Sequence, residues 1–328
     1  MALNFEQEKL EKELDERQPK KAMVQLPEGI KRNALEIQEI FEKKGIEVIF
    51  SGETAWGACS IALHEAQAAN VDLLVHFGHA KFIEADFPIV YIEVRDEMDL
   101  LPLAEKSLEN LKGCDKIGLA YSIQHKHEIE KLKKFYEDNG KEVFIPKKQG
   151  YAAEAGHVVG CEYSGLRVIE EQVDCFVVIG NQFHSMGAAL AVKKPIFLMD
   201  AYNYNVRDMH GVREKIIKQR VAAIEKFKES QTIGIIIEVK PGQQFGSPKS
   251  LVKKFREKGK NVVVITMDEL TPEKIMNFYH IDGFVELACP RIATDDYAKY
   301  EKPILTFKEA LIALGEKTWE DIERIGLI

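Results

Sequence analysis

Short runs of apolar residues alternate along the chain with longer segments in which apolar positions recur at helical spacing. The runs at 175–180 (CFVVIG) and 232–239 (TIGIIIEV) are apolar at nearly every position, which is typical of strands covered on both faces of a sheet. The charged segment at 127–140 (HEIEKLKKFYEDNG) instead has the spacing of an amphipathic helix. Strands separated by such helices favour right-handed crossovers and parallel sheets, so the pattern predicts an α/β fold.

This pattern occurs three times, and each copy ends in an apolar strand followed by a turn of small residues. The copies lie at 45–80, 140–182 and 259–290. We therefore predict three homologous units, each a four-stranded parallel sheet flanked by helices, arranged about a pseudo-threefold axis. The predicted domains are residues 1–113, 114–228 and 229–328.

Each copy also contributes one cysteine close to a strand end. Cys59 and Cys161 each stand thirteen residues before the aspartate of a Val-Asp pair, and each is predicted to open a helix. The third copy has Glu269 at that place and carries Cys289 just after its last strand. Ligands of open α/β sheets lie beyond the carboxyl ends of the strands. If those edges face one another, the three thiols converge.

Composition narrows the class of protein. The chain has 328 residues, 45% hydrophobic and 30% charged, as in globular proteins with a large core. A net charge of −8 argues against a nucleic-acid partner, and no run approaches the ~18 apolar residues of a membrane span. The charged N-terminus lacks the apolar stretch of a signal peptide, so we expect a cytoplasmic protein with no membrane partner.

The cysteines suit an iron–sulfur cluster better than other uses. Five scattered cysteines, an odd number, do not make a disulfide framework. Structural zinc takes four ligands and often shows C-x-x-C pairs, which the chain lacks. Three distant thiols suit a 4Fe–4S cluster with one iron open for substrate. The alternative is that the cysteines are small buried hydrophobic residues, and we adopt it for Cys114 and Cys175.

Three turns at predicted strand ends are candidates for the wall of one pocket. They lie at 78–80 (GHA), 183–187 (FHSMG) and 240–246 (KPGQQFG). Backbone N–H groups at a strand end that begins a helix can hold an anion, although each turn taken alone is more often an ordinary connection. The chain has neither a Walker A loop nor a G-x-G-x-x-G motif after its first strand, which disfavours NTPase and dinucleotide functions.

The motifs around the cysteines resemble a known family, the archaeal 2-(3-amino-3-carboxypropyl)histidine synthases of diphthamide biosynthesis. The resemblance spans about residues 20–315 and rests on WGACS, VDLLVHFGHA, GC-x-YSG, IGNQFHSMGAALAVKKPIFLMDAY, KPGQ and ELACPRIATDD. It implies a homodimer of three-domain subunits, with one 4Fe–4S cluster held by Cys59, Cys161 and Cys289. It further implies S-adenosylmethionine as co-substrate, an electron donor, and a histidine of translation elongation factor 2 as acceptor.

The resemblance also implies a reaction. An electron from the reduced cluster breaks the bond from sulfur to the methionine γ-carbon, and the resulting 3-amino-3-carboxypropyl radical adds to C2 of the target imidazole. Methylthioadenosine is the co-product, and no catalytic side chain beyond the cluster ligands is expected. The residues expected to bind S-adenosylmethionine are Gly57, Gly78, His79, Gly180, His184, Gly187, Lys240, Gly242 and Gln243.

Two alternatives share the expected architecture. Quinolinate synthase is also built from three related domains with one cluster cysteine each, and its open iron acts as a Lewis acid. A metal-free α/β ligand-binding protein is the non-enzymatic alternative. Consumption of S-adenosylmethionine would separate the first alternative from the family above, and a colourless anaerobic preparation would favour the second.

Overall fold

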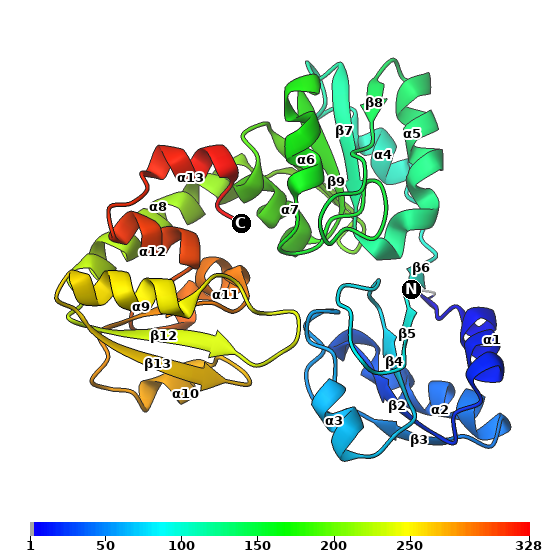
Figure 1. Cartoon of the computed structure of the whole chain (residues 1–328). Helices are drawn as coiled ribbons and strands as arrows, with labels where there is room; N and C mark the ends of the chain where they lie inside the picture. The colour runs from blue at the N-terminus through cyan, green and yellow to red at the C-terminus, as the bar shows by residue number, and fades with distance from the viewer. Residues whose placement is uncertain (1–2) are drawn as a thin grey trace.

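Three α/β bodies lie around a common centre in the computed structural model, which describes residues 3–328 (Figure 1). Their sheets contain four, five and four strands in chain order of the units. The prediction of three α/β units is therefore confirmed, with one correction to the second sheet. Among residues 3–328, no helix combines the length and apolar character needed to cross a membrane.

The first unit has a parallel sheet with strand order β3-β2-β4-β5. Its strands are β2 (Lys21–Gln25), β3 (Glu47–Phe50), β4 (Leu73–Phe77) and β5 (Ile89–Ile92). The helices are α1 (Gln7–Arg17), α2 (Ala34–Lys43) and α3 (Leu63–Ala68). The N-terminal α1 is highly charged, but Leu10 and Leu14 are buried in the core of this unit. A small antiparallel pair, β1 (Leu3–Asn4) and β6 (Arg95–Asp96), lies beside them.

The second unit has five strands where four were predicted. Its strands, in the order β11-β10-β9-β7-β8, are β7 (Lys116–Tyr121), β8 (Glu142–Phe144), β9 (Cys175–Gly180), β10 (Ile196–Asp200) and β11 (Asn205–Asp208). The additional β11 is antiparallel to β10. The chain reverses there because Asp200 Oδ1 accepts hydrogen bonds from the N–H groups of Tyr202 and Asn203, a turn that such side chains favour. The helices are α4 (Leu101–Ser107), α5 (Ile129–Asp138), α6 (Ser164–Ile169) and α7 (Gln182–Ala191).

The third unit has a parallel sheet with strand order β13-β12-β14-β15. Its strands are β12 (Thr232–Glu238), β13 (Asn261–Met267), β14 (Gly283–Glu286) and β15 (Ile304–Leu305). The helices are α9 (Pro248–Glu257), α10 (Pro272–Met276), α11 (Pro290–Asp295), α12 (Phe307–Ala313) and α13 (Trp319–Ile325).

Two segments join the second and third units. Helix α8 (His210–Lys228) buries Ile216 in the core of the second unit and Phe227 in that of the third. The C-terminal segment returns to the second unit, where Leu327 N donates to Leu190 O at 2.9 Å. The hydrophobic cores therefore cross the predicted domain boundary at residue 229, and the boundaries stay predictions.

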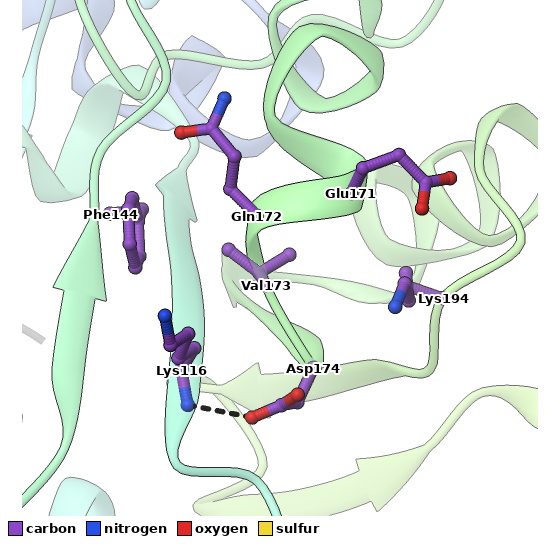
Figure 2. Close-up of a pocket in the computed structure, with 7 residues that line it drawn as sticks. All are labelled: Lys116, Phe144, Glu171, Gln172, Val173, Asp174 and Lys194. Atoms are coloured by element: carbon purple, nitrogen blue, oxygen red, sulfur yellow. Dashed lines mark hydrogen bonds between the residues drawn. The ribbon is translucent and has the colours of Figure 1, made fainter.

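One aspartate per unit fixes the start of the first strand. Asp72, Asp174 and Asp282 each accept hydrogen bonds from two successive backbone N–H groups there, at 2.8 to 3.0 Å. Figure 2 shows the second copy, with Asp174 beside Lys116 in a hollow of about 380 Å³. This hollow lies at the amino edge of the sheet, so it is remote from the carboxyl edge where ligands of such sheets bind. The repeated aspartates support the threefold internal homology inferred from sequence.

Candidate functional site

The three cysteines of the repeat lie in turns between strands and helices. Cys59 and Cys161 were predicted to open helices, but α3 begins only at Leu63 and α6 at Ser164. Cys289 occupies the N-cap position of α11, which begins at Pro290, and its side chain makes no capping hydrogen bond. All three thiols are free and partly exposed.

The three thiols influence one another electrostatically. Burial raises the pKa of the Cys161 thiol to about 12, and the charge of Cys59 raises it further. Burial likewise raises the pKa of Cys289 well above its ordinary value, with contributions from Cys161 and Cys59. Such coupling falls off with distance, so these shifts are consistent with the prediction that the three thiols converge.

The cysteines are not arranged around a single ion. Within residues 3–328, no three His, Cys, Asp or Glu side chains are placed to ligate one metal ion together. The ligands of a cubane bind different irons, so their sulfur atoms stand farther apart than the ligands of a mononuclear site. Thiolates are the ligands by which proteins hold iron–sulfur clusters, so the chemistry of three thiols fits a 4Fe–4S cluster.

Cys59 is held by a loop of the third unit. The loop that connects β12 to α9 reaches toward the first unit (Figure 1). Gly242 N donates to Cys59 O at 2.9 Å, and Gln243 Nε2 donates to Cys59 Sγ at 3.3 Å. A Cβ on Gly242 would lie 2.5 Å from Cys59 Cα, closer than van der Waals contact allows. Glycine is therefore required for this approach, and Gly57 also lies beside the same sulfur.

Arg291 joins the second and third units beside the thiols. Its Nη1 donates to Gly160 O at 3.0 Å, and its Nε and Nη2 donate to the Asp295 carboxylate at 2.8 and 2.6 Å. Its guanidinium carbon lies 3.9 Å from the centre of the Phe183 ring, a distance typical of a cation–π contact. The sequence analysis missed Arg291, although its place two residues after Cys289 was an available signal.

Two glycines of the predicted pocket have structural explanations within the chain. A Cβ on Gly187 would collide with Tyr163 Oη and would lie 2.6 Å from Arg291 Nη1. Gly78 has a φ of +82°, and a Cβ there would lie 2.7 Å from Pro27 Cγ, so its conformation and surroundings both favour glycine. These glycines accommodate protein atoms, and their proposed contacts with S-adenosylmethionine stay predictions.

The first histidine of the predicted pocket belongs to a buried polar chain. His76 Nδ1 donates to Gln25 Oε1 at 2.8 Å, which leaves His76 Nε2 to accept from His79 Nδ1 at 2.9 Å. Gln25 is itself oriented by donation from Nε2 to Ser60 O at 2.9 Å. Burial lowers the pKa of His79 to about 4, so this imidazole is neutral at physiological pH.

The second predicted histidine lies at the start of α7. His184 Nδ1 is 3.0 Å from Asn181 Oδ1. A Cβ built on the neighbouring Gly180 would lie 3.5 Å from the same ring nitrogen. Burial and the charge of Arg291 lower the pKa of His184 to about 3, with smaller effects from His157 and His79. The second unit therefore presents another neutral imidazole in the same region.

Lys240 of the third unit lines a small hollow of about 30 Å³, together with Trp56 and His64 of the first unit. Its ammonium nitrogen lies 3.8 Å from the buried carboxylate of Glu238. Lys240 therefore lies in the same loop as Gly242 and Gln243, which contact Cys59.

The two other cysteines lie away from this site. Cys175 begins β9 at the amino edge of the second sheet, and Cys114 packs with it in the same core. Burial raises the pKa of Cys175, and interaction with the Cys114 thiol raises it further. The two cysteines therefore belong to one hydrophobic core, in keeping with the interpretation of both as small buried hydrophobic residues.

Residues 26–323 match the family of diphthamide synthesis proteins. The chain belongs to this family. The resemblance recognised in the motifs is thereby confirmed, and the family match decides against quinolinate synthase and a metal-free binding protein. The chain is an enzyme of diphthamide synthesis.

Curated relatives and solved structures agree with this family. The chain is 30% identical to the 2-(3-amino-3-carboxypropyl)histidine synthase of Pyrococcus horikoshii, over 96% of this chain and 91% of the relative. It is 28% identical to subunit 1 of the corresponding synthase from Kluyveromyces lactis, over 95% and 75%. The crystal structure of P. horikoshii Dph2 with a 4Fe–4S cluster superposes with a TM-score of 0.89 at 29% identity, covering 100% of this chain and 95% of that one.

Proposed function

We propose that this diphthamide synthesis protein transfers the 3-amino-3-carboxypropyl group of S-adenosylmethionine to C2 of a histidine in translation elongation factor 2, releasing methylthioadenosine. The observation that carries the proposal is the pair of contacts between units beside the repeat cysteines: Gln243 of the third unit donates to Cys59 Sγ of the first, and Arg291, two residues after Cys289, donates to Gly160 O next to Cys161 of the second. The cluster-bearing crystal structure of a relative supports the same cofactor class.

In this proposal Cys59, Cys161 and Cys289 hold the cluster and leave its fourth iron open. When bound, the reduced cluster supplies the electron that breaks the bond from the sulfonium to the methionine γ-carbon. The surrounding residues suit sulfur ligands, because Gln243 donates to one thiol and the Arg291 charge lowers the pKa of Cys161 against the raising effect of burial. Hydrogen bonds and charge at the sulfur atoms are means by which proteins tune such clusters.

The pocket residues would bind and orient S-adenosylmethionine. A sulfonium is a cation, so neutral imidazoles at His79 and His184 avoid the repulsion that imidazolium groups would cause. The ion pair with Asp295 likewise offsets the charge of Arg291. Lys240, in the loop that holds Cys59, is the proposed partner for the substrate carboxylate. The glycines Gly57, Gly180 and Gly242 limit the bulk beside these groups.

We further propose that the chain works as a homodimer with elongation factor 2 as its protein substrate and a separate electron donor. All three inferences come from the family, whose relatives include the histidine synthase of P. horikoshii. The acidic net charge of −8 is consistent with a protein partner and disfavours binding to RNA.

Product analysis tests the reaction. The anaerobically purified chain, after cluster reconstitution, is incubated with S-adenosylmethionine with and without dithionite, and the nucleosides are separated by chromatography. Methylthioadenosine that requires reductant is expected. 5′-Deoxyadenosine as the main nucleoside would contradict cleavage at the γ-carbon, and methylthioadenosine without reductant would indicate polar transfer. Adding elongation factor 2 should then give a protein mass increase that its target-histidine variant lacks.

A further inference from the structure

A chain of hydrogen bonds fixes which nitrogen of His76 carries a hydrogen. Gln25 Oε1 accepts from Ala62 N at 3.0 Å, and Gln25 Nε2 donates to Ser60 O at 2.9 Å. These two backbone groups therefore set the orientation of the Gln25 amide. His76 Nδ1 lies 2.8 Å from Gln25 Oε1, and an amide oxygen can only accept a hydrogen bond. His76 Nδ1 is therefore the protonated nitrogen of this ring.

The same reasoning extends to His79. His76 is completely buried, and burial lowers its pKa well below the ordinary value, so its ring is neutral and its Nε2 holds an electron pair. His79 Nδ1, 2.9 Å away, must donate to that nitrogen. A neutral imidazole carries one hydrogen, so His79 Nε2 holds an electron pair as well. Because His76 engages Nδ1 and the His79 residue is partly exposed, Nε2 is the nitrogen left for a ligand.

His79 stands where the third unit carries one of the repeat cysteines. Seven residues after the aspartate that fixes the first strand of each unit, the chain has His79, Asn181 and Cys289 in turn. His79 is thus the counterpart of Cys289 at the carboxyl edge of the first sheet. Gln124 Nε2 of the second unit donates to Gly78 O at 2.6 Å, so this edge contacts the neighbouring unit. His79 therefore lies at a junction between units, as Cys289 does.

The proposed reaction needs a group that removes a proton. When the 3-amino-3-carboxypropyl radical bonds to C2 of the target imidazole, C2 carries both the new carbon and its original hydrogen, and the ring is no longer aromatic. Aromaticity returns when the ring loses that proton and one electron. The electron goes to a one-electron acceptor of the iron–sulfur class, and the proton goes to a base.

We propose that His79 is this base: its Nε2 accepts the C2 proton of the target imidazole, while His76 and Gln25 hold the ring in the tautomer that leaves Nε2 unprotonated. The inference rests on the proposed function and adds a catalytic side chain to it. As the proton arrives, Nδ1–H becomes a stronger donor to His76 Nε2, which stabilises the new positive charge. A general base must be unprotonated at the working pH, and the low pKa of His79 ensures this. A weak base suffices because loss of the C2 proton restores aromaticity.

Other bases near the repeat cysteines are less suitable. Asp295 is occupied by hydrogen bonds from Arg291. His184 also donates from Nδ1, to Asn181 Oδ1, but burial and the charge of Arg291 oppose its protonation and lower its pKa to about 3. Protonation of His79 is opposed by burial without a neighbouring cation. It also has a second imidazole, that of His76, as its hydrogen-bond acceptor.

Nuclear magnetic resonance tests the tautomer independently of turnover. Two-bond ¹H–¹⁵N spectra of the cluster-loaded chain, labelled with ¹⁵N-histidine, should show His76 and His79 both protonated at Nδ1 and unprotonated at Nε2. His76→Gln and His79→Gln identify the two sets of signals by their loss. Protonation of His79 at Nε2 would overturn the proposal whatever the activity of the enzyme.

His79→Ala separates proton removal from cleavage of S-adenosylmethionine. The variant should retain its cluster and form methylthioadenosine with dithionite at the wild-type rate. Transfer to elongation factor 2 should fall roughly 100-fold or more, the usual contribution of a positioned base. Free imidazole at millimolar concentration should restore part of the transfer, because it fits the space left by the side chain. The matched control, His280→Ala, alters an exposed histidine of the third unit and should transfer like the wild type without responding to imidazole.

Deuterium at C2 of the target histidine gives a readout that a merely structural role of His79 would not change. In single turnovers, His79→Ala should transfer more slowly to the deuterated substrate, since breaking the C2–H bond then limits the rate, while methylthioadenosine formation should show no isotope effect. Absence of the isotope effect on transfer, or loss of methylthioadenosine formation in His79→Ala alone, would overturn the assignment of the base. A wild type without reductant-dependent methylthioadenosine would instead overturn the proposed reaction, and the base step with it.

Discussion

Gln243 of the third unit donates a hydrogen bond from Nε2 to Sγ of Cys59 in the first unit, at 3.3 Å. Gln243 itself is almost fully buried, and its neighbour Gly242 bonds to the Cys59 carbonyl. Hydrogen bonds to cluster sulfurs stabilise the reduced, more negative state and raise its potential. The contact therefore lets the third unit influence the reduction potential of the proposed cluster through the Cys59 ligand of the first unit.

Removing this hydrogen bond should lower the midpoint potential of the bound cluster. We expect Gln243→Leu to retain iron but to shift the potential by about 20–60 mV to more negative values, from the usual worth of one hydrogen bond. Redox titration followed by electron paramagnetic resonance measures the shift. Gln244→Leu alters an exposed residue of the same loop and should leave the potential unchanged. Equal potentials for the two variants would contradict the tuning role.

Loss of a single cluster cysteine should abolish cluster binding while the fold survives. Cys59→Ala, Cys161→Ala and Cys289→Ala are each expected to lose cluster and turnover, because each thiol comes from a different unit and no neighbour can replace it. Cys114→Ala and Cys175→Ala should keep both. Iron and sulfide analysis after anaerobic reconstitution measures this. Cluster loss in Cys114→Ala with retention in Cys289→Ala would disprove the assignment.

Arg220 and Glu309 form a buried ion pair that fixes the surroundings of α11. Arg220 Nε and Nη2 each donate to the Glu309 carboxylate at 2.7 Å, and Arg220 Nη1 donates to Ala293 O at 2.7 Å. Both side chains are almost fully buried. Arg220→Met should lower the free energy of unfolding by roughly 3–5 kcal/mol, because it leaves Glu309 buried without its partner.

Urea denaturation followed by circular dichroism measures this loss. The matched control is Arg324→Met, which removes an exposed arginine 3.9 Å from Asp321. Exposed pairs contribute little, so the control should change the free energy of unfolding by less than about 1 kcal/mol. A small effect of Arg220→Met would mean that the pair is not required for the fold.

Gly187→Ala should destabilise the site although alanine normally favours a helix. The added Cβ meets Tyr163 Oη and Arg291 Nη1, so Arg291 must move from its position beside the cysteines. We expect a loss of about 1–3 kcal/mol together with reduced cluster occupancy. Gly211→Ala in α8 has no atom within 4 Å of its would-be Cβ and should change stability by less than about 0.5 kcal/mol. Thermal unfolding and iron analysis compare the two.

Local sequence patterns determined the units and their repeated chemistry. Apolar runs separated by amphipathic helices predict parallel α/β sheets because burial on both faces requires apolar residues throughout the strand. The spacing from Cys59 and Cys161 to the following aspartates reflects one local structure repeated, in which Asp72 and Asp174 fix the first strands. These features depend on residues close in the sequence or on a repeated unit, so they can be recognised before the structure is known.

The tertiary structure decided which groups meet between the units. Arg291 contacts the Gly160 carbonyl 131 residues away, and Gln243 contacts Cys59 across 184 residues. Periodicity does not encode such contacts, because they depend on how three separately folded sheets pack at their strand ends. The same holds for Gly187, whose sequence neighbours give no sign of Tyr163 and Arg291 packed against it. The exposure of Val263 and Val264 could not be predicted either, because it depends on the place of β13 at the edge of its sheet. The same apolar sequence would be buried in an inner strand.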